Sequence, residues 1–118
     1  MKQIYVLLTL LLLPTLSNAA FIEGLEDVPV MEGLSQTQND SISFGNEESR
    51  LVEAVLASES THFHQVEKFY ANTLPQMGWI YQGKREKTLI FEREGEIIEI
   101  NEEQKKPLLV RITVKSKI

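Results

Sequence analysis

The sequence contains no cysteine. Disulfide cross-links, metal sites built on thiolates and thiolate catalysis are therefore excluded. There is also no cysteine to carry the lipid of a lipoprotein. An exported chain without cysteine is more typical of a bacterial periplasm than of a eukaryotic extracellular space, where small domains are commonly cross-linked.

Basic residues and histidines are also scarce. The chain has 12 Lys and Arg against 17 Asp and Glu, a net charge of −5, so we expect no nucleic-acid partner. The two histidines, His62 and His64, have no third histidine to complete a metal site, and their imidazoles are expected to diverge at the start of a helix. We predict no metal and no other cofactor, since the sequence also lacks a glycine-rich phosphate loop.

The one long apolar run, Ile4 to Leu13, is about half the length that a membrane-spanning helix needs. Lys2 precedes it and the small residues Ser17–Ala20 follow, an order typical of a secretory signal peptide. We predict that residues 1–19 are this peptide, cleaved after Ala19 or alternatively after Ala20; an uncleaved anchoring helix is the other interpretation. Cleavage removes Lys2 and no acid, leaving 11 basic and 17 acidic residues, a net charge of −6. The product would be periplasmic or secreted, bacterial, and not membrane-spanning.

Residues 20–40 are predicted to form an extended N-terminal segment. Its apolar residues are scattered among acids, and Pro29 favours extended geometry in the residue before it. An α+β domain is predicted over residues 41–118. Its first two strands are Ser41–Phe44 and Arg50–Ala57, joined by the turn Gly45–Ser49.

A helix is predicted next, with Ser60 or Thr61 as its N-cap. Pro75 should distort its last turn, and Gly78 suits the left-handed position that ends helices. Helical spacing places one set of apolar residues on the buried face: Phe63, Val66, Tyr70 and Leu74, with Phe69 beside them.

Strands are predicted after the helix at Trp79–Lys84, Lys87–Glu94 and Glu96–Asn101. The last strand, Leu108–Ile118, alternates apolar and polar residues and follows a charged turn, Glu102–Pro107. Sequential hairpins imply an antiparallel sheet. The predicted fold class is α+β, with one helix packed on an antiparallel sheet in the order ββαβββ.

One segment has the pattern V-x2-FY-x3-LP-x2-GW, running from Val66 to Trp79. An earlier D-x-P-x-x-x-G segment starts at Asp27. Together they resemble an uncharacterised family of small exported proteobacterial proteins, and the resemblance covers nearly the whole chain after the signal peptide. It implies export and a helix-on-sheet fold, and it implies no activity.

The aromatic residues Tyr70, Trp79 and Tyr81 are the candidate ligand-binding residues. They could line a groove between helix and sheet, although a fold this small needs its large side chains in the core, where each contributes roughly 1.5–3 kcal/mol. A second candidate cluster consists of carboxylates around a predicted hairpin turn, which we interpret as an exposed charged face: Glu92, Glu94, Glu96 and Glu99.

We predict no catalytic residues and no enzyme activity. The leading hypothesis is an exported binding module of the bacterial envelope that contacts another envelope protein or envelope component, through strand edges or the segment Phe21–Leu34. The alternative is a small carrier of an apolar ligand, held in a cleft between helix and sheet. The sequence leaves the oligomeric state, the partner or ligand, and the biological process open.

Overall fold

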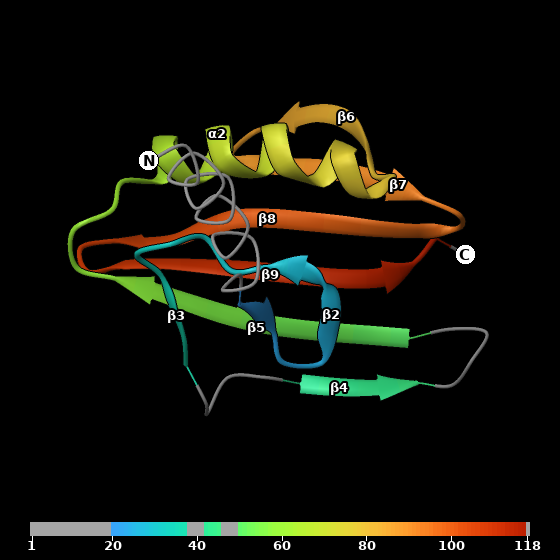
Figure 1. Ribbon diagram of the computed structural model, residues 1–118, viewed down its shortest axis with the longest axis horizontal. Coiled ribbons are helices and arrows are strands. Elements are labelled where there is room, and N and C mark those ends of the chain that lie inside the picture. Colours follow the sequence, from blue (N-terminus) through green and yellow to red (C-terminus); the bar gives the residue numbers. More distant parts are fainter. Residues whose placement is uncertain (1–19, 38–41, 46–49, 118) are drawn as a thin grey trace, which may run out of the picture.

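A computed structural model describes residues 20–37, 42–45 and 50–117 (Figure 1). The predicted signal peptide, residues 1–19, lies outside the described residues, and so does most of the predicted turn Gly45–Ser49. In the described part of the chain, no helix is both long enough and apolar enough to cross a membrane.

The main sheet is antiparallel throughout its described pairings, in the order β3-β5-β9-β8-β7-β6, with β4 also paired to β5. A separate two-stranded sheet is formed by β1 and β2. The strand bounds are β1 Phe21–Ile22, β2 Leu25–Pro29, β3 Ser35–Gln36, β4 Ile42–Gly45, β5 Arg50–Ser58, β6 Ile80–Arg85, β7 Thr88–Arg93, β8 Glu96–Lys105 and β9 Leu108–Ser116.

The prediction of one helix packed on an antiparallel sheet is confirmed, but the order ββαβββ is wrong. The four strands predicted after the helix are present, one more than the order ββαβββ counts, and short strands at Phe21–Ile22, Leu25–Pro29 and Ser35–Gln36 precede the predicted first strand. The charged residues Glu102–Lys105, predicted as a turn, continue strand β8 opposite Leu108–Val110. The hydrogen bonds between paired strands are made by backbone groups and do not require apolar side chains. The charged end of a strand therefore stays paired when its partner strand is long enough to reach it.

Helix α2 spans Phe63–Thr73 and is followed by a 3₁₀ turn, η2, at Leu74–Met77. Pro75 stands at the start of η2, and Gly78 closes it in the left-handed conformation with φ 93°, as predicted. The N-cap is His62, so Ser60 and Thr61 were wrong. Their backbone N–H groups donate instead to the hydroxyl of Ser58, at 3.2 and 3.0 Å, and form the turn that precedes the helix.

One face of the sheet forms the core. The inward residues of β5, β7, β8 and β9 are buried, including Leu89 and Phe91 of β7, Ile98 and Ile100 of β8, and Leu108, Val110, Ile112 and Val114 of β9. Helix α2 contributes Val66 and Tyr70 to the same core, and η2 contributes Leu74. The other face carries alternating polar residues such as Glu99 and Lys115, which form an ion pair at 3.3 Å.

The N-terminal segment packs on the core side of the sheet, next to α2 (Figure 1). Its buried side chains belong to the same hydrophobic cluster as the helix and the sheet: Ile22, Leu25, Val28 and Leu34. A Cβ added at Gly24 would lie 3.7 Å from Cγ1 of Val52, a core residue of β5. The β1–β2 hairpin and α2 therefore together cover the core face of the main sheet.

Candidate functional site

Two of the three candidate ligand-binding aromatics belong to the interior. Tyr70 is 0% exposed and Trp79 is 1% exposed, whereas Tyr81 is 42% exposed. The hydroxyl of Tyr70 donates a 2.6 Å hydrogen bond to the carbonyl oxygen of Pro29. This bond joins the FY pair of the helix to the D-x-P segment of β2, so the polar tip of Tyr70 faces protein and no open groove.

Arg93 on β7 connects the remaining parts of the two motifs. Its guanidinium lies 4.2 Å from the centroid of the Trp79 ring and donates a 2.9 Å hydrogen bond to the carbonyl of Met77. It also forms an ion pair with Asp27 of β2. A Cβ at Gly78 would lie 3.3 Å from Cδ of Arg93, so the glycine also leaves room for this side chain. The motif residues thus form one structural network that anchors the N-terminal segment.

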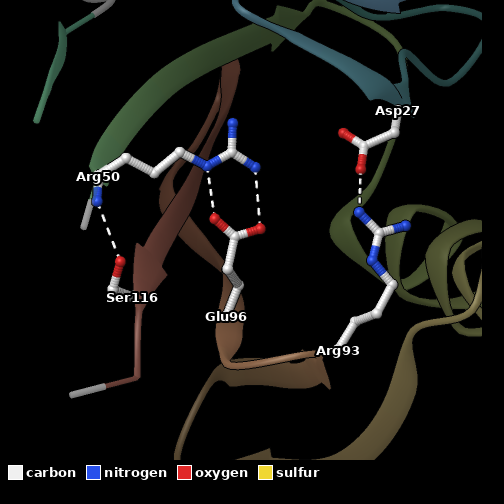
Figure 2. A network of polar contacts seen from close by, with 5 residues as sticks. All are labelled: Asp27, Arg50, Arg93, Glu96 and Ser116. Atoms are coloured by element: carbon white, nitrogen blue, oxygen red, sulfur yellow. Dashed lines mark hydrogen bonds and ion pairs between the residues drawn. The ribbon is translucent and has the colours of Figure 1, made fainter. Parts of the chain in front are cut away.

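Figure 2 shows the ion pair between Arg93 and Asp27 beside a second arginine–carboxylate pair. Arg50 at the start of β5 bonds Glu96 at the start of β8 through two nitrogens, with Nε–Oε2 at 2.5 Å and Nη2–Oε1 at 2.9 Å (Figure 2). The backbone N–H of Arg50 donates to the hydroxyl of Ser116 at 3.0 Å. Hydrogen bonding to Glu96 raises the pKa of Arg50 further above its ordinary value. Bidentate pairs of this kind fix the orientation of the two side chains relative to each other.

The carboxylate cluster around the β7–β8 turn is largely neutralised. Glu96 is held by Arg50, Glu92 is 3.0 Å from Nζ of Lys117, and Glu99 pairs with Lys115. Glu94 occupies the turn itself, where φ is 49°, and is exposed. Each partnered carboxylate contacts a cation and is at least partly exposed, as expected of a solvated charged face.

The open part of the helix–sheet boundary lies beside Tyr81. A surface groove of about 210 Å³ is lined by Glu67, Lys68 and Ala71 of α2, Tyr81 and Lys84 of β6, and Leu89 of β7. The ring of Tyr81 packs against the ring of Phe91, with ring centroids 5.0 Å apart. One side of the Tyr81 ring therefore contacts the core, while the other side borders the groove. Of the three candidate aromatics, Tyr81 alone lines this groove.

Strand β6 makes this groove part of a sheet edge. It pairs with β7 on one side and, among the described strands, has no partner on the other. Ile80 is 65% exposed and, together with Tyr81, places exposed apolar surface along that edge. A shift in register between Tyr81 and Gly83 marks a β-bulge in this strand. Unpaired edge strands offer backbone donors and acceptors to another chain.

The charges beside the edge are mainly positive. Lys84 Nζ lies 2.5 Å from Oε2 of Glu67, and this ion pair raises the pKa of Lys84. No ion pair within the described residues engages Lys68, Arg85 or Lys87. Glu86, exposed in the β6–β7 turn, is an acid between two of these cations, but the cations beside the edge still outnumber the acids in a chain whose net charge is −5.

Ile80, Lys68 and Arg85 were not predicted as site residues from the sequence. The signal that could have found them is the strand after Gly78, which has apolar residues on both faces at its start and two cations at its end. A central strand packed on one side would instead alternate.

The two histidines do not diverge as expected. His62, at the N-cap, has extended backbone angles (φ −102°, ψ 151°). The two side chains are therefore not rotated apart as residues two positions apart within a helix would be. Both histidines border one surface hollow of about 310 Å³, together with Phe63 and with Glu102, Lys105 and Lys106 of the β8–β9 hairpin. In the described residues, no cluster of three or more potential metal ligands exists.

No family model, curated protein or solved structure matches this chain.

Proposed function

We propose that this protein is a non-enzymatic binding module of the bacterial envelope that pairs an extended segment of another envelope protein with strand β6. The observation that carries the proposal is the exposed β6 edge, with Ile80 and Tyr81 among the few exposed large apolar side chains of the described chain. An added strand would gain main-chain hydrogen bonds along β6 and side-chain contacts in the groove beside Tyr81.

The charges at the edge favour an acidic partner segment. Lys68, Arg85 and Lys87 have no ion-pair partner among the described residues, and their side chains are exposed. An incoming strand with Asp or Glu beside these cations would gain favourable electrostatics, and an apolar residue at its centre would cover Ile80. Basic residues also protect an edge from pairing with copies of itself, so a distinct acidic partner suits this edge better than self-association.

The carrier hypothesis takes second place because no observation favours it. The space between α2 and the sheet is filled by Val66, Tyr70, Leu74 and Trp79, all essentially unexposed. The groove beside Tyr81 is small and open at the surface.

Site-specific photo-crosslinking tests the proposal. A photoreactive phenylalanine replaces Ile80, and a matched probe replaces Ile97, a partly buried isoleucine on the outer face of the sheet away from the edge. In envelope extracts, we expect an adduct from position 80 that maps to an extended acidic segment, that is absent from position 97, and that disappears when Lys68 and Arg85 are both changed to Glu. Equal adducts from both positions, or an adduct that the charge reversals leave unchanged, would contradict the proposed surface.

A further inference from the structure

The hollow at the start of α2 gathers cationic side chains in an acidic protein. His62 and His64 come from α2 and its cap, and Lys105 and Lys106 come from the end of β8 and the turn that follows, some forty residues later in the chain. Figure 1 places the start of α2 and the β8–β9 turn at the same end of the sheet. Glu102 is the one acid among the lining residues.

Apart from Lys68, Arg85 and Lys87 beside strand β6, the basic side chains of the described chain outside this hollow are neutralised by carboxylates. Arg50, Lys84, Arg93, Arg111, Lys115 and Lys117 all form ion pairs with carboxylates. No such pair engages Lys105 or Lys106 within the described residues. Two adjacent lysines beside two imidazoles repel one another when all are charged, and a bound anion would relieve that repulsion.

The walls of the hollow are held in place. Phe63 lies between the two histidines and packs partly against the hydrophobic core. The backbone N–H of His62 donates a 2.9 Å hydrogen bond to Oε1 of Gln65, which fixes the start of the helix. On the opposite wall, the side chain of Gln104 donates to the carbonyl of Pro107 at 3.0 Å and closes the turn that carries the lysines. The cationic side chains therefore project from two fixed backbones.

From this arrangement we infer that the hollow between His62, His64, Lys105 and Lys106 is a binding site for a small oxyanion, of the phosphate, sulfate or carboxylate class. Its volume of about 310 Å³ admits such a group, and ammonium and imidazolium groups are the natural partners of its oxygens. The charged groups that line the hollow with the histidines are Glu102, Lys105 and Lys106, and only Glu102 opposes the anion.

Sulfate is the probe for the test, since it is a fully ionised oxyanion at neutral pH. Histidine ring resonances are followed by NMR while sulfate is added, with chloride at equal ionic strength as the reference. We expect saturable shifts of both histidines with sulfate, and no such saturation with chloride.

Variants separate a site from diffuse attraction. Lys105→Gln with Lys106→Gln should weaken sulfate binding at least tenfold, whereas Lys87→Gln, which removes an exposed lysine of the β6–β7 turn, should change it less than twofold. His64→Gln, at an exposed position, should weaken sulfate binding without loss of folding. Unsaturable shifts, or equal weakening by Lys87→Gln and the paired lysine changes, would overturn the inference.

Two further arms identify the source of the oxyanion. Succinate in place of sulfate reports on carboxylates, and vesicles of phosphatidylglycerol report on a lipid phosphate. Competition between vesicles and sulfate for the histidine shifts would assign the site to a lipid headgroup; free sulfate or succinate binding without competition would assign it to a soluble anion.

Discussion

Replacing Trp79 with alanine tests whether the GW end of the motif belongs to the core. Trp79 is 1% exposed, in contact with the core cluster, and covered by the guanidinium of Arg93 at 4.2 Å. Emptying a buried aromatic site of this kind costs about 3–5 kcal/mol, and loss of the stacked cation falls within that range. Against a total stability of about 5–15 kcal/mol, the change removes a large share and can unfold the domain.

The assay is equilibrium unfolding in urea followed by circular dichroism, because Trp79 is the single tryptophan and its fluorescence disappears with the substitution. Tyr81→Ala is the matched control. Its ring is 42% exposed, so about half of an aromatic side chain's burial is lost, a cost of about 1 kcal/mol. A Trp79→Ala variant within about 1 kcal/mol of the parent, or one less destabilised than Tyr81→Ala, would show that Trp79 does not belong to the core.

The remaining predictions concern the contacts around the motif. Burial raises the pKa of Tyr70, so its phenol ionises more easily in the unfolded chain, where the pKa is about 10. The stability that this group contributes is complete below pH 10 and falls above it by up to about 1.4 kcal/mol per pH unit. Tyr70→Phe should remove that part of the alkaline loss and cost about 1 kcal/mol at pH 7 through the bond to Pro29, which urea midpoints at pH 7, 10 and 11 would check. Arg93→Met should cost about 1–3 kcal/mol and speed amide exchange in β2, measured by hydrogen–deuterium exchange against Arg85→Met; equal exchange in the two variants would contradict the anchoring role. Ile80→Asp should change stability by less than about 1 kcal/mol, because the side chain is 65% exposed; a larger loss in thermal unfolding would place Ile80 in the core.

Local pattern predicted most of the elements. Helical spacing identified the buried face of α2, where Val66 and Tyr70 are unexposed, and Pro75 with Gly78 predicted the end of the helix. Period-two alternation identified the inward residues of the last strand. These signals are local because burial repeats with the geometry of a single element.

Features that depend on distant partners could not be read in the same way. The ion pair between Arg93 and Asp27 spans 66 residues, and no spacing rule links them. The N-cap was misplaced because Ser58, which the pattern assigned to no role, accepts from Ser60 and Thr61. The charged end of β8 was taken for a turn because its strand pairing is made by backbone groups.

The candidate site was predicted only in part. Tyr81 lines the groove, as its aromatic character suggested, while Tyr70 and Trp79 are buried. Exposure depends on which strand lies at the sheet edge, and strand order is a property of the whole chain. The sequence places β6 next to β7 through a short turn, but it does not reveal that β9, and not β6, pairs with β5.

Native mass spectrometry of the protein, purified gently from its own envelope fraction, tests directly whether the β6 edge binds another protein. We expect an added protein mass that is present with the parent chain, lost with Ile80→Asp, and retained with the matched change Ile97→Asp. An added mass of a few hundred daltons that Ile80→Asp leaves unchanged would contradict this expectation and favour a carrier of a small ligand.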